Sequence, residues 1–158
     1  MEGDYTDDPG VVIRNLKPED CSRLVAIDKQ ITGRSRRVWY EGKLKRALEE
    51  SDVRVSLGAD SEGMLVGAML AAVHFGEFGL TEPVAVLDTV LVDPAVERRG
   101  VARALFRQLM LNLRGLRIER LRTEVAWDDH DLVSFFAKMG FLPVPRLVLE
   151  TEVQGEVP

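Results

Sequence analysis

The stretch Val92-Asp93-Pro94-Ala95-Val96-Glu97-Arg98-Arg99-Gly100-Val101-Ala102 decides the fold of this chain. It separates an apolar run from a helical pattern, so it predicts a strand, a turn and the start of a helix. Pro94 ends the strand, Gly100 lets the backbone approach a ligand closely, and Ala102 presents little bulk. Successive amide N–H groups at the helix N-terminus can then point at an anion.

Three arginines accompany this turn. Arg98 and Arg99 precede Gly100, and Arg103 lies in the first turn of the predicted helix. Their guanidinium groups can pair with phosphate oxygens. Taken alone, an Arg-Arg-Gly turn is more often a solvated helix start than an anion site. Whether this turn is a solvated helix start or an anion site therefore depends on the surrounding sequence.

The run before the turn is predicted to be the central strand. Ala85–Val92 is apolar except for Asp88 and Thr89, as expected of a strand that is covered on both faces. Strict alternation of side chains would place Asp88 and Val92 on one face and Leu91 on the other.

The remaining sequence alternates between helical and strand patterns. Helical spacing of apolar residues predicts helices over Pro18–Ile27, Arg37–Glu50, Val101–Leu116 and Leu132–Met139. Apolar, β-prone runs predict strands over Val11–Arg14, a hairpin of residues 53–57 and Met64–Phe75, and then Ala85–Val92, Leu121–Val125, a stretch from Phe141 onward and Leu147–Val153. This order predicts an α/β fold of the α+β type, with a central mixed sheet of about six or seven strands flanked by about four helices.

Length and composition fit one globular domain. The chain has 158 residues, of which 46% are hydrophobic and 30% are charged. We expect a single domain over residues 11–158, after a flexible acidic tail at residues 1–10 that has no apolar core of a secretion signal. The single cysteine and the lack of an apolar run of membrane length favour a cytoplasmic location without membrane association.

Charge and metal-ligand patterns exclude some partners. The formal net charge of −5 argues against nucleic acid as the main partner. The two histidines have no cysteine cluster of zinc-binding spacing around them, so we expect no metal. Exposed sheet edges would allow a homodimer.

Two sequence blocks together resemble the GCN5-related N-acetyltransferase (GNAT) family. That family's acetyl-CoA motif runs from an apolar strand through Val-x-Pro into Gln/Arg-x-x-Gly-x-Gly/Ala and a helix, and the last positions here read Glu97-Arg98-Arg99-Gly100-Val101-Ala102. The second block runs from Thr123-Glu124-Val125 through Asp129 to Phe135–Phe141, and it is similar to the family's next strand and helix ending in Gly-Phe. The resemblance implies a GNAT-like fold for residues 11–153.

The resemblance also implies an activity. It is the transfer of an acetyl group from acetyl-CoA to a primary amine on a small molecule, a lysine or a protein N-terminus, by direct attack in a ternary complex. The positions that would hold the cofactor are those that match the two motif blocks. They are Leu91, Val92, Arg98, Arg99, Gly100, Val101, Ala102, Arg103, Asp129 and Phe136.

Two positions depart from the family pattern. Glu97 stands where the family prefers Gln or Arg, and we expect its charge to turn away from the pyrophosphate. Phe136 stands where many members have a tyrosine that protonates the leaving thiolate, so the general acid stays unassigned. Ser134, Tyr40 and water are the substitutes that we consider. These departures keep a non-catalytic acyl-CoA sensor or partner module as an alternative.

The reaction would need a base and donors to an oxyanion. Asp88 is the first candidate base because it interrupts an apolar strand just before the turn, and Glu124 is the second. Either side chain could instead be a carboxylate that a neighbouring group holds for structural reasons. The backbone N–H of Leu91 or Val92 is the candidate oxyanion donor.

The acceptor would be bound by the basic and aromatic segment between the first two helices. Arg36, Trp39 and Tyr40 could select an acidic or peptide-like acceptor. The alternative is a solvated charge run with Trp39 packed into the core.

Overall fold

The computed structural model describes residues 10–50, 55–156 and 158 of the chain. Nearly all of the tail expected at residues 1–10, and Val53 of the predicted hairpin, lie outside these residues. The chain divides into two compact units, Met1–Glu124 and Val125–Pro158.

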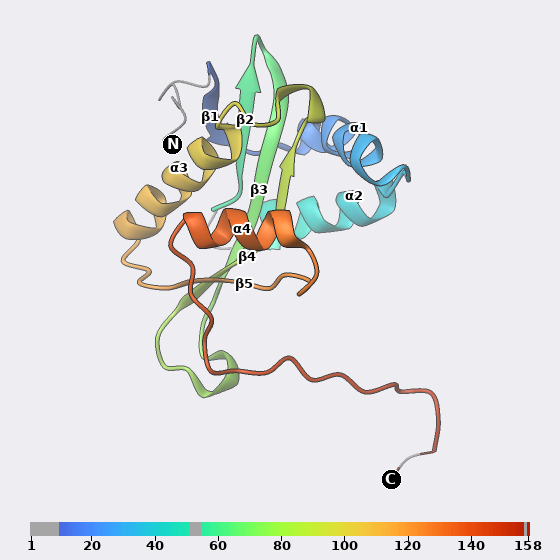
Figure 1. Cartoon of the computed structure of the whole chain (residues 1–158), viewed down its shortest axis with the longest axis vertical. Coiled ribbons are helices and arrows are strands. Elements are labelled where there is room, and N and C mark those ends of the chain that lie inside the picture. Colours follow the sequence, from blue (N-terminus) through green and yellow to red (C-terminus); the bar gives the residue numbers. More distant parts are fainter. Residues whose placement is uncertain (1–9, 51–54, 157) are drawn as a thin grey trace. The chain divides into compact units, whose positions relative to one another are not determined.

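The first unit contains a five-stranded mixed sheet with the strand order β1-β2-β3-β4-β5 (Figure 1). Its strands are β1 (Val12–Asn15), β2 (Leu57–Ser61), β3 (Met64–His74), β4 (Val84–Val92) and β5 (Leu121–Thr123). The strands from β1 to β4 pair antiparallel, and β5 pairs parallel to β4. β4 is thus the strand at which the antiparallel and parallel parts meet.

Helices cover both faces of this sheet (Figure 1). α1 (Cys21–Thr32) and α2 (Arg37–Lys45) lie on one face, and α3 (Val101–Gly115) lies on the other. The core beneath α1 and α2 combines apolar side chains of both helices with side chains of β3 and β4, among them Leu24, Ile27, Leu44, Leu70 and Leu91. On the opposite face, Leu105 and Leu109 of α3 are fully buried.

Gly67 of β3 lets α3 approach the sheet closely. A Cβ atom at this position would lie 2.9 Å from Val101 Cγ1, 3.2 Å from the Leu91 carbonyl oxygen and 3.3 Å from Leu105 Cδ1. A close-packed interior has no room for such an atom unless its neighbours shift. The start of α3 and the end of β4 therefore pack directly against the backbone of β3.

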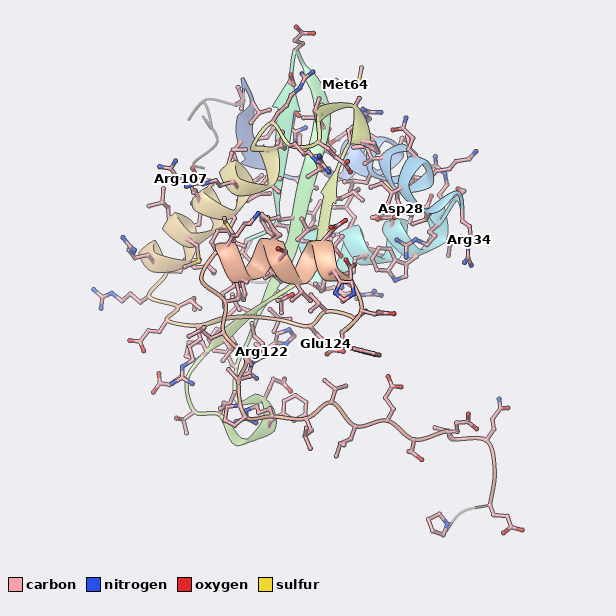
Figure 2. The ribbon with its side chains drawn as sticks, in the orientation of Figure 1. Asp28, Arg34, Met64, Arg107, Arg122 and Glu124 are labelled. Carbon is pink, nitrogen blue, oxygen red and sulfur yellow. The ribbon has the colours of Figure 1, made fainter. Side chains whose placement is uncertain are left out.

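A buried carboxylate ties α2 to α1 (Figure 2). Asp28 is 1% exposed, and it accepts hydrogen bonds from Arg36 Nε at 2.8 Å, from Arg36 Nη2 at 2.5 Å and from the Tyr40 hydroxyl at 3.0 Å. The bonds from Arg36 are the main reason why the pKa of Asp28 lies below its ordinary value. Burial, together with the bond to Asp28, raises the pKa of Tyr40. These three side chains fix the start of α2 relative to α1.

The second unit contains α4 (His130–Lys138). Asp129 caps this helix, because its Oδ1 accepts a hydrogen bond from the Leu132 N–H at 3.1 Å. The ring of Phe136 packs against Phe141, with 4.8 Å between the ring centroids. Among the described residues, no helix of either unit is both long and apolar enough to cross a membrane.

The predicted fold class is confirmed, but the sheet has fewer strands than expected. The strands predicted from Phe141 onward and over Leu147–Val153 are wrong, because residues 141–156 form no strand. Pro143 and Pro145 have no N–H to donate to a ladder. A β-prone run becomes a strand only where a neighbouring strand accepts its hydrogen bonds, and none pairs with this segment in the described part of the chain.

The other predicted elements occur with shifted ends. A 3₁₀ turn, η1 (Pro18–Asp20), precedes α1, which continues to Thr32 and ends at Gly33 with a left-handed φ of +74°. The predicted second helix changes at its end into a π-helical turn, η2 (Arg46–Glu50). β5 stops at Thr123, two residues earlier than predicted.

Gly67→Ala should lower the free energy of unfolding by about 1–3 kcal/mol, because the added Cβ meets the Val101 side chain and the Leu91 carbonyl. Chemical denaturation would measure the change. Gly115→Ala is the matched control at the far end of α3, where a Cβ meets no atom within 4 Å. The control should leave stability unchanged or raise it by up to about 1 kcal/mol. Equal effects of the two substitutions would contradict the close approach of α3.

Asp28→Asn should lower the free energy of unfolding at pH 7 by about 2–3 kcal/mol, because Arg36 loses its charged acceptor. The pKa of Asp28 is lower in the folded chain than its unfolded value of about 3.9, so the carboxylate stabilises the fold at higher pH and loses this effect as the pH falls through the folded pKa. Denaturation at several pH values should show the difference from the parent shrinking below about pH 4. Tyr40→Phe removes one hydrogen bond and keeps the carboxylate. It should lower the free energy of unfolding by less than Asp28→Asn does. If the difference in free energy of unfolding between variant and parent stays constant below about pH 4, the ion pair of Asp28 with Arg36 is contradicted.

Candidate functional site

The predicted anion-binding turn joins the end of β4 to the start of α3. Arg98 and Gly100 both have left-handed backbone conformations, with φ of +64° and +84°. The leading amides of α3 have no acceptor within the helix, and left-handed residues before a helix commonly form a concave row of N–H groups. The side chains of Arg98, Arg99 and Arg103 are exposed around this row. Glu97 is also exposed.

Asp93 anchors the entrance to this turn. It is buried, and its Oδ1 accepts a hydrogen bond from the Ala95 N–H at 2.9 Å. Its Oδ2 accepts one from Arg23 Nη2 at 2.5 Å, and Arg23 Nε donates to the Leu65 carbonyl at 2.8 Å. One ion pair thereby joins the turn to α1 and β3.

Sequence reasoning missed both partners of this ion pair. The Asp-Pro step after a strand is a signal for Asp93, because an aspartate at that place accepts a hydrogen bond from an amide two residues on. Arg23 has no comparable signal, since its partner lies 70 positions away in the sequence.

A β-bulge determines where Asp88 points. The register of β4 on β3 shifts next to Thr89, and Asp88 is the residue without a partner on β3. The extra residue interrupts the alternation of side chains. Asp88 consequently contacts Lys43 of α2, and Leu91 packs in the core beneath α1 and α2, so both lie on the same face. The prediction of opposite faces for Asp88 and Leu91 is wrong for this reason.

Both oxygens of the Asp88 carboxylate have partners. Lys43 Nζ donates to Oδ2, and the Thr89 hydroxyl donates to Oδ1 at 2.7 Å. The side chains of Lys43 and Asp88 are 24% and 35% exposed. The carboxylate therefore binds an ammonium group at a position that solvent reaches. Glu124, the second candidate base, directly follows β5 and is exposed (Figure 2).

β4 continues beyond the end of its pairing with β5. The parallel ladder covers only Ala85–Leu87 of β4, and at its end the Thr123 hydroxyl donates to the Leu87 carbonyl at 2.7 Å. From Asp88 to Val92, this edge of β4 has no strand partner among the described residues. The edge is open where the chain approaches the predicted anion-binding turn.

One of the two candidate oxyanion donors points to this open edge. The Asp93 N–H donates to the Val66 carbonyl of β3 at 2.7 Å. N–H groups alternate in direction along an antiparallel strand, so the Leu91 N–H also points to β3 and the Val92 N–H points away from it. Val92 therefore offers its amide at the edge.

Two cations lie near the Trp39 ring, one at the N-cap of α2 and one within the helix. Arg36 Cζ is 5.1 Å and Lys43 Nζ is 5.9 Å from the ring centroid, and these positions follow one face of the helix. Trp39 is 41% exposed, so it does not pack into the core as the alternative interpretation held. Tyr40 is fully buried, and its hydroxyl donates to Asp28. Lys43 was not among the predicted site residues, although its spacing of four from Trp39 was a signal.

The remaining predicted cofactor residues, Asp129 and Phe136, belong to the second unit. Within that unit Asp129 is the cap of α4, and Phe136 packs against neighbouring aromatic rings. No cluster of three or more His, Cys, Asp or Glu side chains that could hold a metal ion occurs within residues 10–50, 55–156 and 158.

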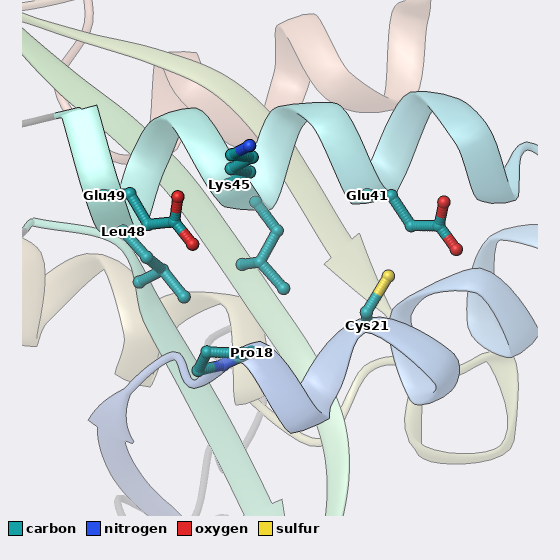
Figure 3. A pocket seen from close by; sticks show the side chains of 7 residues that line it. Pro18, Cys21, Glu41, Lys45, Leu48 and Glu49 are labelled. Atoms are coloured by element: carbon teal, nitrogen blue, oxygen red, sulfur yellow. The ribbon is translucent and has the colours of Figure 1, made fainter.

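A separate pocket lies between the start of α1 and the end of α2 (Figure 3). It has a volume of about 180 Å³, and its lining combines apolar and charged side chains: Pro18, Cys21, Glu41, Leu44, Lys45, Leu48 and Glu49. Burial, together with the nearby charge of Glu41, raises the pKa of the Cys21 thiol, which disfavours the thiolate form. The pocket contains none of the predicted site residues.

Solved structures share this fold. The chain matches an aminoglycoside N-acetyltransferase AAC(6')-Iy in complex with CoA with a TM-score of 0.75 and 16% identity, over 90% of this chain and 95% of that one. It matches a ribosomal-protein-alanine N-acetyltransferase from Brucella melitensis biovar Abortus 2308 with a TM-score of 0.70 and 17% identity, over 90% and 98%. It also matches a transcriptional regulator from Bacillus halodurans C-125 with a TM-score of 0.74 and 15% identity, over 90% and 99%. Such low identities show the fold alone.

The sequence itself identifies the family. A search of curated proteins finds no significant match. The family model of the Acetyltransferase (GNAT) family, however, matches residues 20–141. This range includes β4, α3, the turn between them and α4. The chain therefore belongs to the GNAT family of acetyltransferases.

Proposed function

We propose that this protein is an N-acetyltransferase that transfers an acetyl group from acetyl-CoA to a primary amine by direct attack in a ternary complex. The observation that carries the proposal is the order of groups along one strand. The ammonium-binding carboxylate of Asp88, the outward N–H of Val92 and the anion-binding turn before α3 follow one another along β4 and its continuation. A donor with phosphates at one end and a thioester at the other requires such a linear arrangement.

The donor's phosphates would lie at the turn. The amides of Gly100, Val101 and Ala102 and the exposed guanidinium groups of Arg98 and Arg99 are the proposed contacts. The solved structure of a similar fold in complex with CoA supports this choice of donor. The pyrophosphate then sets the direction in which the thioester extends along the open edge of β4.

Asp88 is the proposed base. It takes a proton from the acceptor ammonium, and the neutral nitrogen attacks the thioester carbonyl carbon. The Val92 N–H stabilises the oxyanion, and the C–S bond then breaks to release the CoA thiolate. The second proton that the attacking nitrogen loses reaches the thiolate through water, since Phe136 has no proton to give and the Tyr40 hydroxyl is committed to Asp28. Glu124 is the alternative base.

The acceptor would approach over α2. Trp39 presents a half-exposed indole next to Lys43, the partner of Asp88. Arg36 lies against the same ring, and Asp28 and Tyr40 hold its guanidinium group from the core. This surface favours an acceptor with an acidic or peptide-like group near its amine.

Gly100→Glu should lower the affinity for acetyl-CoA at least about a hundredfold, or about 2.7 kcal/mol, because a carboxylate would lie at the proposed pyrophosphate site. Calorimetry would measure binding. Gly63→Glu is the matched control: Gly63 has a similar left-handed φ of +80°, and a Cβ there also meets no atom within 4 Å, but it lies in the β2–β3 turn. The control should bind acetyl-CoA like the parent. Unchanged affinity in Gly100→Glu would rule out the turn as the donor site.

Asp88→Asn should reduce kcat/KM by about 10²–10⁴-fold, because no group then accepts the proton of the acceptor ammonium. Free-thiol release would be measured with an amine panel over a range of pH, and the pH profile of its rate should change. Calorimetry should show nearly the same affinity for acetyl-CoA as in the parent. Glu124→Gln is the parallel variant that tests the second candidate. An unchanged pH profile in Asp88→Asn would remove Asp88 as the base. Binding of acetyl-CoA without thiol release for any amine would favour the sensor function.

A further inference from the structure

A lysine of the chain itself occupies the position next to the proposed base. Lys43 Nζ donates to Asp88 Oδ2, and the same ammonium lies 5.9 Å from the ring centroid of Trp39. Within the described residues, Lys43 is the one lysine that forms an ion pair with a carboxylate. Its side chain belongs to α2, whereas Asp88 belongs to β4, so the contact joins two elements of the site.

The same position is one that an acceptor can occupy. An amine that passes its proton to Asp88 lies either within hydrogen-bonding distance of that carboxylate or one water away from it. The ammonium of Lys43 meets this condition, and it is a primary amine on a flexible four-carbon stem. The bulge at Asp88 directs the carboxylate toward α2, and without it the pair could not form.

We propose that Lys43 is itself an acetyl acceptor of this site and is modified within its own chain when acetyl-CoA is bound and no other amine competes. This proposal rests on the proposed function. It assigns a modification site to Lys43 and a place for the acceptor nitrogen between Asp88 and Trp39.

The reaction is balanced without a further reagent. Asp88 takes one proton from the Lys43 ammonium, and the neutral Nζ attacks the carbonyl carbon of the thioester. The N–C bond forms and the C–S bond breaks. The second proton that Nζ loses goes to the departing sulfur, which leaves as the CoA thiol, and the proton on Asp88 returns to solvent.

The modification would change the site that makes it. An amide nitrogen carries no charge, so acetylated Lys43 no longer forms an ion pair with Asp88. The carboxylate would then be open to the ammonium of an external acceptor. Trp39 would keep the cation of Arg36 on its ring.

The test is incubation of the full chain with acetyl-CoA in the absence of any added amine, followed by intact mass and peptide mapping. One acetyl group should be found at Lys43, and it should form at least about ten times faster there than at Lys45, the exposed lysine two residues further along the same helix. The first-order rate should not depend on protein concentration, because the reaction occurs within one chain.

Variants separate catalysed from spontaneous modification. Lys43→Arg keeps a cation beside Asp88 but has no acylable amine, so the fast adduct should disappear, whereas Lys45→Arg should retain it. Asp88→Asn and Gly100→Glu should both slow the labelling of Lys43 to the rate of Lys45. Labelling that stays fast in Gly100→Glu would show ordinary chemical acetylation and would overturn the proposal.

Failure of this inference differs from failure of the proposed function. If added amines release CoA thiol in a reaction that depends on Asp88, but Lys43 is labelled no faster than Lys45, the self-modification is refuted and the acetyltransferase remains. If calorimetry detects no binding of acetyl-CoA to the parent chain, both are refuted. Fast labelling of Lys43 that requires Asp88 and Gly100 supports both.

Discussion

One extra residue in β4 controls the geometry of the site. Without the bulge, the alternation of the strand would turn Asp88 to the face covered by α3, away from α2. With it, the carboxylate meets Lys43 and lies on the same face as Leu91, while the strand keeps its pairing with β3 on both sides of the irregularity. A charged group is thereby presented beside a largely apolar core without being enclosed in it.

The elements that depend on local pattern were predictable from the sequence. α3 has strong helical spacing and a glycine at its start, and its predicted and observed ranges differ by one residue at the end. The hairpin of β2 and β3 also follows local rules. The turn between β4 and α3 was predictable because proline, glycine and arginines occur within a few positions of one another, and its role in anion binding stays a prediction.

The features that depend on distant partners were not predictable. The bulge at Asp88 is defined by the register with β3, and the ion pair of Arg23 with Asp93 connects segments far apart in the sequence. Lys43 shares α2 with other charged residues, and it is its contact with Asp88 on β4 that distinguishes it. The run Leu147–Val153 shows the reverse error: its residues are β-prone, but a strand also needs a partner, which the residues do not encode locally.

The Arg23–Asp93 ion pair and the close approach at Gly67 have a shared consequence for ligand binding. Both hold the backbone between β4 and α3 in place: one fixes the entrance of the turn and the other packs the first residue of α3 onto the sheet. Amides that are already ordered lose little conformational entropy when an anion arrives. The turn is in this sense preorganised, so binding of the proposed pyrophosphate would not have to order a loop. The conformational freedom of the turn resides instead in the long, exposed side chains of Arg98, Arg99 and Arg103, which must be ordered individually, whereas Lys43 is already held by Asp88.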